Sequence, residues 1–300
     1  MSDPRAIIAT MSANVFRGSE AIARGEVTRH ELRRWYRPVF PGVYTEAGQH
    51  LSLRQRAEAA WLWSRRHGIV AGVAASALHG AQWVDDDHSI DLVCSRPRSP
   101  VGIVARDLLL ADDEVARIAG LPVTGLVRTA YDLGRLLPRD QAVARLDALV
   151  RATRFSPGAV LALAERYPAA RGARRLRTAL ELVDGGAASP KETELRLLLI
   201  DAEFPRPVTQ IPIVVNYRTL AVLDMGWPEF GVAAEYDGDE HRTSRPRYAW
   251  DQKRLRKLTE LGWIVVRVIG EDTREDVIER VKGALVARGW RRGGKPALAG

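Results

Sequence analysis

The chain has 300 residues, of which 46% are hydrophobic and 27% charged, with a formal net charge of +8 and a pI near 10. This composition predicts a globular protein of two or three domains and favours a polyanionic partner. Cys94 is the single cysteine, which excludes an intrachain disulfide and a cysteine-based zinc site. No stretch approaches about 18 apolar residues and no signal peptide is evident, so we expect a cytoplasmic protein without a membrane span.

The first organised unit, Ser19–Glu46, has the pattern of a helix followed by a hairpin. Thr28-Arg-His-Glu31 has the spacing of a capping box and predicts a short helix that ends near Tyr36. Pro41-Gly42 marks the tip of a β-turn-β wing within Arg37–Thr45. This order is typical of a winged helix-turn-helix over residues 1–50, in which four arginines could meet DNA phosphates: Arg29, Arg33, Arg34 and Arg37. The alternative is a small helix–hairpin cap whose arginines are merely solvated.

Residues 51–135 predict a mixed α/β body, and residues 136–188 a helical connector rich in Ala, Leu and Arg. Helices are expected at Leu53–His67 and Ala71–His79, and a strand at Ser89–Ser95. Arg128 and Asp132 are spaced i and i+4 on an expected helix, which predicts a surface ion pair.

Two motifs of this body carry a family resemblance: SALHG at Ser76–Gly80 and GLPVTGLVRTAYDLGR at Gly120–Arg135. Together with Ser19–Glu46, they resemble the N-terminal region of AbiEi-family antitoxins of type IV toxin–antitoxin systems. The resemblance implies a DNA-reading wing on a mixed α/β body. A toxin partner would follow only if the chain were such a regulator.

A further helix is expected at Lys191–Ala202, after a Gly- and Ala-rich linker. Ser189-Pro-Lys-Glu192 places Ser at the N-cap, Pro at the first helical position and Glu three residues after the cap. Glu192 could be a capping partner, a metal ligand or both.

Two apolar strands follow, Ala221–Trp227 and Gly231–Tyr236, and each contains an acid where an apolar residue would be expected. A loop of two residues places Asp224 diagonal to Glu235, and a loop of four residues places the two acids directly opposite each other. Buried carboxylates that lie close together repel and need compensation. A divalent cation bound by oxygen ligands would supply it. The alternative is pairing with Arg or Lys from the helix that follows.

A third acid, Asp237, and then His241 follow the second strand. Beyond them we expect a helix at Tyr248–Leu261, a strand at Trp263–Val268 and a helix at Glu271–Ala287. Seven basic residues lie between His241 and Lys257 and could bind a nucleic acid or form a solvated helix face: Arg242, Arg245, Arg247, Lys253, Arg254, Arg256 and Lys257.

The order helix, strand, acidic strand, acidic strand, basic helix and strand resembles the Vsr-like branch of the PD-(D/E)xK restriction-endonuclease superfamily. The segments that carry the resemblance are SPKETELR, the Asp in VLDMGWP, EYDGDEH, and the D-x-x-R-x-x-x-L-x-x-x-G-W run from Asp251 to Trp263. It implies a nuclease-like αβββαβ domain over residues 189–290, before a flexible tail at 291–300.

By this resemblance, Asp224 and Glu235 would hold a catalytic Mg²⁺ or Mn²⁺, Glu192 would support them, and His241 would stand near the scissile phosphate. The chain departs from the motif at Asp237, where the superfamily usually has Lys. Asp237 could be an extra ligand, or could mark a degenerate site. Two functions therefore stay open: an endonuclease acting on duplex DNA, including mismatched or branched DNA, or a non-catalytic, antitoxin-like DNA-binding regulator. A homodimer is compatible with both.

Overall fold

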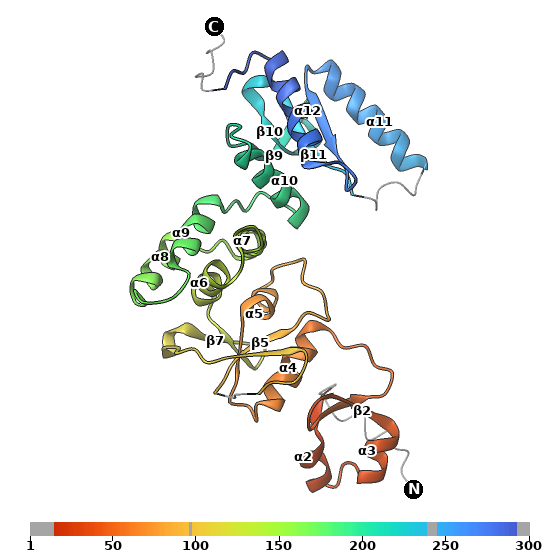
Figure 1. Cartoon of the computed structure of the whole chain (residues 1–300). Coiled ribbons are helices and arrows are strands. Elements are labelled where there is room, and N and C mark those ends of the chain that lie inside the picture. Colours follow the sequence, from red (N-terminus) through yellow and green to blue (C-terminus); the bar gives the residue numbers. More distant parts are fainter. Residues whose placement is uncertain (1–14, 96–97, 239–244, 293–300) are drawn as a thin grey trace. The chain divides into compact units, whose positions relative to one another are not determined.

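A computed structural model describes residues 15–95, 98–238 and 245–292. The chain divides into two compact units, Met1–Glu181 and Leu182–Gly300 (Figure 1). Helices and mixed sheets occur in both, which confirms the predicted mixed α/β class. The predicted nuclease-like domain lies within the second unit, and the helices of the predicted connector up to residue 181 lie within the first.

The N-terminal part of the first unit is a helix pair with a three-stranded sheet. Helix α2 (Gly18–Ala23) precedes α3 (Arg29–Trp35), and the sheet has the order β1-β3-β2. Its strands are β1 (Phe16–Arg17), β2 (Tyr36–Phe40) and β3 (Val43–Glu46). The predicted capping box begins α3, because Thr28 and Glu31 exchange side-chain and backbone hydrogen bonds. The expected helix and hairpin are therefore confirmed, whereas α2 and β1 were not predicted.

The body of the first unit is a five-stranded mixed sheet in the order β6-β5-β4-β8-β7. Helices α4 (Leu53–Trp63) and α5 (Gly72–Leu78) contribute to its core together with strand residues such as Val70, Ile90 and Leu92. The strands are β4 (Ile69–Ala71), β5 (Ile90–Val93), β6 (Ile103–Arg106), β7 (Val115–Ile118) and β8 (Leu121–Thr124).

Four helices complete this part of the chain. They are α6 (Leu126–Leu136), α7 (Arg139–Thr153), α8 (Pro157–Glu165) and α9 (Ala173–Leu182). Each buries leucines, and Pro157 occupies the first position of α8.

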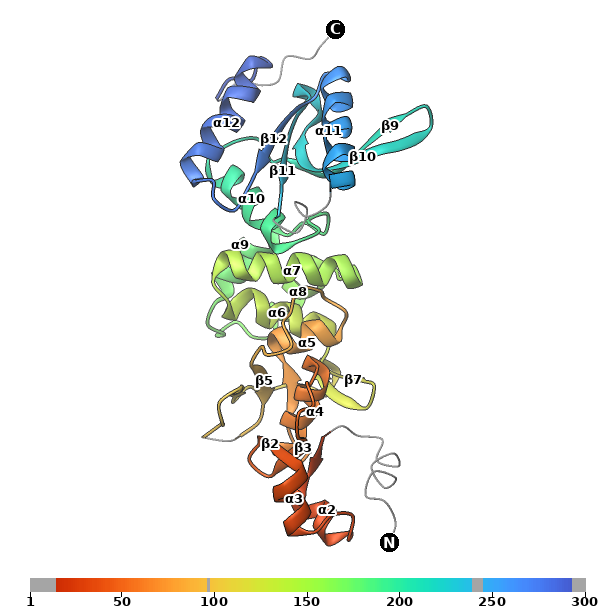
Figure 2. The same cartoon turned by 90° about the vertical axis from the view of Figure 1, so that its right-hand side faces the viewer.

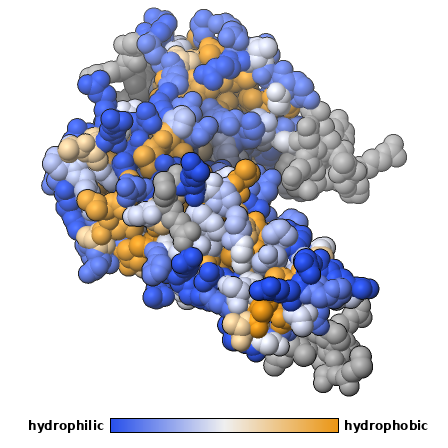
Figure 3. All heavy atoms as spheres, turned by 60° about the horizontal axis from the view of Figure 1, so that its bottom comes forward, coloured by the Kyte–Doolittle hydropathy of each residue, from blue (hydrophilic) through white to orange (hydrophobic). Residues whose placement is uncertain are grey.

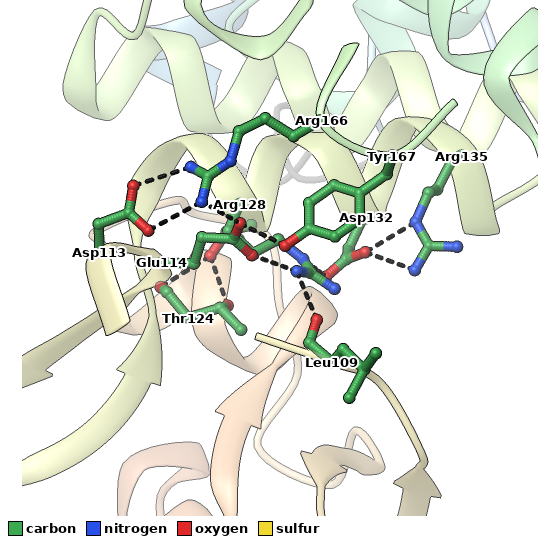
Figure 4. A network of polar contacts seen from close by, with 10 residues as sticks. Leu109, Asp113, Glu114, Thr124, Arg128, Asp132, Arg135, Arg166 and Tyr167 are labelled. Atoms are coloured by element: carbon green, nitrogen blue, oxygen red, sulfur yellow. Dashed lines mark hydrogen bonds and ion pairs between the residues drawn. The ribbon is translucent and has the colours of Figure 1, made fainter. Parts of the chain in front are cut away.

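A network of buried charges centres on Arg128 of α6 (Figure 4). Arg128 Nε donates to Asp132 at 2.8 Å, and Arg128 also contacts the Glu114 carboxylate. Arg135 binds the same Asp132, and the Tyr167 hydroxyl donates to Glu114 at 2.5 Å. Arg128 and Asp132 are only 3% and 1% exposed, so the prediction of a surface pair was wrong. The i, i+4 spacing predicted that the two side chains pair. Their burial depends on residues that are distant in the sequence, such as Glu114 and Tyr167, and local spacing does not reveal these contacts.

The second unit has a four-stranded sheet in the order β12-β11-β10-β9, in which β11 and β12 are parallel and the other pairs antiparallel. In chain order the elements are α10 (Pro190–Asp201), β9 (Val208–Val215), β10 (Arg218–Trp227), β11 (Val232–Tyr236), α11 (Arg245–Glu260), β12 (Ile264–Val268) and α12 (Arg274–Ala287). This is the order of elements expected from the sequence.

Two apolar clusters hold the second sheet. Residues of α10 and α12 pack with Met225, Trp227 and Val266, whereas Leu258 of α11 packs with Leu223 and Ala233. Helices therefore cover the strands that contain Asp224 and Glu235, and the two acids are held in a packed layer.

Hydrophilic residues dominate the face of the molecule in Figure 3, and hydrophobic residues form separate patches among them. Among the described residues, no helix is both long and apolar enough to cross a bilayer.

Candidate functional site

Strands β10 and β11 place Asp224 opposite Glu235. Trp227 pairs with Val232 and Met225 with Ala234, and the same register continued by one residue joins the two acids. The connection is the four residues Pro228–Gly231, a 3₁₀ turn that ends at Gly231 with φ 59°. Of the two predicted loop lengths, the four-residue loop is the one observed.

The Asp224 carboxylate is partly buried and has no cationic partner within ion-pair distance among the described residues. Its Oδ2 accepts the backbone N–H of Tyr236 at 2.9 Å. Desolvation first, and then the nearby charges of Glu192 and, to a smaller extent, Glu235, together raise the pKa of Asp224 to about 7 against the lowering effect of the Tyr236 hydrogen bond. Asp224 is therefore a carboxylate that the protein leaves poorly compensated.

Glu192 lies three residues after Ser189, the predicted N-cap of α10, whose Oγ accepts the Glu192 backbone N–H at 3.2 Å. Its Oε2 accepts the backbone N–H of Ala188 at 2.8 Å, and Ser189 Oγ lies 3.1 Å from Oε1. Glu192 also borders the candidate site, because Gln210, which lies across from Asp224, donates to it and its charge helps to raise the pKa of Asp224. Both roles predicted for Glu192 thus stay compatible with its position.

Gln210 is a site residue that the sequence did not reveal. It lies across from Asp224 between the pairs Leu223–Ile211 and Met225–Thr209, and its φ is +52°. Its Nε2 donates to Glu192 Oε2 at 3.2 Å. A left-handed conformation is unfavourable for a residue with a Cβ and is often found at functional sites. No sequence signal marks such a backbone position when the residue is not Gly or Asn.

Glu235 is neutralised by Arg254 of α11. Arg254 Nη1 and Nη2 bind the two carboxylate oxygens at 2.9 and 2.7 Å, and both side chains are largely buried. Pairing with the following helix, the alternative to a metal, is thus observed for Glu235 but not for Asp224. Arg254, which was predicted to meet nucleic acid, here contacts Glu235 and Asp251 instead.

Asp237, at the position of the expected motif lysine, is also paired. Arg267 of β12 binds Asp237 Oδ2 at 2.6 Å and Asp251 Oδ2 at 2.9 Å. Arg267 pairs with Glu235 in the parallel register, so the acidic strand lies between two arginines, Arg254 and Arg267. Neither Arg267 nor the bridging Asp251 was predicted at the site.

The basic segment before α11 is only partly described. His241 and Arg242 lie outside the described residues, and so do the side chains of Arg245 and Arg247 in the first turn of α11. Lys253 is exposed on α11, where it is accessible to a nucleic acid.

The geometry and charge of the acids decide whether they fit a metal ion. In the described part of the chain, no three His, Cys, Asp or Glu residues are grouped so as to hold a metal. Mg²⁺ at nucleic-acid sites, however, is usually bound by one or two carboxylates together with water and substrate phosphates. Asp224, with its carboxylate oxygens, its raised pKa and Glu192 nearby, fits a site that needs only one or two carboxylates.

Helix α3 and strand β2 form a cationic surface with the four arginines predicted to meet DNA, which are called the wing arginines below. Arg29, Arg33, Arg34 and Arg37 are all exposed, and none of them forms an ion pair with a described carboxylate. Arg34 stacks on Trp35 at 5.0 Å, and Arg37 Nη2 donates to the Gln49 carbonyl at 2.7 Å. The four charges are thus available to an anionic partner.

Comparison with known proteins gives relatives over nearly the whole length. The chain is 30% identical over 273 residues to the uncharacterized proteins MT2308 and Rv2248, from two strains of Mycobacterium tuberculosis. The match covers 90% of this chain and 94% of each relative. No family model matches. The crystal structure of the RV2827C protein of M. tuberculosis aligns with 69% of this chain and 82% of its own at 17% identity, with a TM-score of 0.42.

Proposed function

The chain belongs to the family of the M. tuberculosis proteins MT2308 and Rv2248, and we propose that it is a metal-dependent DNA endonuclease. The observation that carries this proposal is Asp224. Its carboxylate sits between Glu192 and the Glu235 strand, accepts one backbone N–H, and has a pKa raised to about 7. Such a perturbed, poorly compensated acid is typical of a functional site.

Asp224 would be the principal ligand of Mg²⁺ or Mn²⁺, with Glu192 and Glu235 as supporting carboxylates. The bound ion would supply a nucleophilic water and stabilise charge on the phosphodiester. Asp224 must be ionised for this role, and the ion's charge would favour that form. His241 would act near the scissile phosphate, and Asp237 would be an additional ligand.

Arg254 has a second role in this proposal. Its guanidinium now binds Glu235 through two parallel hydrogen bonds. The same planar fork suits a phosphate group. Release of Glu235 would therefore make one carboxylate available to the ion and one guanidinium available to the DNA.

The exposed arginines of the wing and Lys253 would hold the duplex through its phosphates, in line with the net charge of +8. We place this activity in the cytoplasm. The substrate would be duplex DNA, including mismatched or branched duplexes. A homodimer would allow both strands to be cut.

A second candidate is a non-catalytic DNA-binding regulator, antitoxin-like, with a toxin as its partner. The observation that favours it is that Arg254 and Arg267 neutralise Glu235 and Asp237. In that case the wing would bind DNA and the second unit would have kept only its fold.

Cleavage of supercoiled plasmid and of mismatched and branched duplexes, with Mg²⁺, Mn²⁺ or EDTA, distinguishes the two. The Asp224→Asn and Glu235→Gln variants are compared with Glu229→Gln, an exposed acid in the connecting turn. Metal-dependent cleavage that is lost in the first two variants and kept in the control supports the endonuclease. Binding without cleavage in the wild type, unchanged in every variant, supports the regulator.

A further inference from the structure

The hairpin of β9 and β10 projects from the sheet of the second unit (Figure 2). Asn216 and Tyr217 alone connect the strands, with φ of 48° and 61°. Positive φ at both central residues is the mark of a type I′ turn, in which the second position prefers Gly. A tyrosine there is held in an unfavourable backbone conformation, which calls for a role of its side chain.

One side of the hairpin is anchored and the other is free. Ile211, Ile213 and Leu223 pack with Leu258 of α11. On the other side Val214 and Val222 are 58% and 46% exposed. The hairpin is thus a rigid ribbon fixed at its base, with an uncovered surface.

The tip carries side chains of the types that contact bases in protein–nucleic acid complexes. Asn216, Tyr217 and Arg218 are exposed, and Tyr217 is fully so. Within the described part of the chain, their side chains make no hydrogen bond or ion pair. Arg recognises guanine and Asn recognises adenine through paired hydrogen bonds. Tyrosine offers a face on which a base can stack.

The charge of the ribbon also suits DNA. No acidic residue occurs from Arg206 to Leu223, so nothing on this segment repels phosphates. A two-stranded ribbon fits the major groove, where apolar side chains such as Val214 can contact thymine methyl groups.

From these observations we propose that the β9–β10 hairpin enters the major groove of duplex DNA and selects the cleavage site through Asn216, Tyr217 and Arg218. This inference rests on the proposed endonuclease function. Strand β10 joins the tip to the site, because Arg218 and Asp224 are six residues apart. At about 3.3 Å a residue this separation is roughly 20 Å, or about six base pairs.

Binding is measured first, in EDTA, so that it does not depend on cleavage. Tyr217→Gly removes the ring while giving the turn its preferred residue, and Arg218→Ala removes the guanidinium. Arg274→Ala, at the exposed start of α12, is the matched control for the change in charge. We expect the two tip variants to bind a preferred 30-bp duplex about 10-fold or more weakly, because each removes a group that binds a base. The control should stay within about twofold.

Cleavage positions are then mapped on end-labelled DNA with Mg²⁺. Tip variants should spread their cuts over more sequences, whereas the rate at saturating DNA should stay close to that of the wild type. Wild-type affinity and an unchanged cleavage pattern in both variants would overturn the proposal. So would a wild-type dimer that Val222→Glu dissociates without affecting DNA binding, since the exposed side would then be a self-interface. If the tip variants bind DNA more weakly but the wild type cuts no DNA, the hairpin's role in DNA recognition would stand and the endonuclease function would be rejected.

Discussion

Arg254 of α11 holds Glu235 of β11 through two nearly parallel hydrogen bonds of 2.9 and 2.7 Å. This pair stands where the endonuclease interpretation places a divalent cation. Pairing of Glu235 with Arg254 and binding of a cation by Glu235 make different predictions for the stability of the second unit, because a buried carboxylate that loses its partner is strongly destabilising.

Arg254→Ala should lower the free energy of unfolding by about 3–5 kcal/mol in EDTA, since it leaves Glu235 buried and unpaired. Urea denaturation measures this loss. Lys253→Ala, an exposed neighbour on the same helix, should change stability by less than about 0.5 kcal/mol. Millimolar Mn²⁺ should restore part of the loss in Arg254→Ala. Equal stability of the two variants would contradict a buried pair.

The raised pKa of Asp224 predicts a pH dependence in metal-free protein. Its folded pKa of about 7 lies above the ordinary value of 3.8, so the folded state binds more protons between these pH values. Stability contributed by this group is therefore present below about pH 4 and is lost as pH rises through 7. Asp224→Asn should thus be more stable than the wild type at pH 8, by at most about 4 kcal/mol, and the difference should shrink toward pH 4. Urea midpoints over this range measure the difference, and a constant difference would refute the shift.

The buried network of the first unit gives a separate stability prediction. Arg128→Ala leaves Glu114 and Asp132 without their shared cation and should cost about 3–5 kcal/mol. Arg24→Ala, which removes an exposed pair with Glu26 in the same unit but outside the network, should cost far less. Thermal and urea unfolding measure the loss of stability in both variants. An equal loss, or a larger loss in the control, would contradict a stabilising role of the network.

The wing arginines predict a salt-dependent contribution to DNA binding. Replacing Arg29 and Arg33 by Ala should weaken binding to all sequences alike. It should also lower the slope of log K against log salt by about 1 for each phosphate that no longer meets an arginine. Arg24→Ala is the matched control, because Arg24 is exposed on the same unit but already paired with Glu26. An unchanged slope in the double variant would place DNA binding elsewhere.

Local sequence signals predicted much of the fold. Capping patterns indicated the starts of α3 and α10, and the alternation of apolar residues predicted β10 and β11, with Asp224 opposite Glu235 as one of two alternative registers. These features depend on neighbours in the chain. The partner of Asp237 does not, because Arg267 reaches Asp237 only through the parallel pairing of β11 with β12.

Two further features were beyond sequence reasoning for the same physical reason. Gln210 enters the site through a left-handed backbone conformation that its residue type does not announce. Arg128 and Asp132 were expected on the surface, and burial by distant elements makes them part of the core. Spacing along a helix specifies which side chains can meet, but it does not specify which face of the helix other elements will bury.

Mn²⁺ binding by Asp224 tests the central claim most directly. The free ion is followed by electron paramagnetic resonance as it is titrated into the protein with a non-cleavable phosphorothioate duplex. We predict one site per chain in the wild type and in Glu229→Gln, and at least a 10-fold loss of affinity in Asp224→Asn. Equal Mn²⁺ binding in the wild type and Asp224→Asn, or none in either, would contradict a metal site at Asp224 and leave the DNA-binding regulator as the function of this chain.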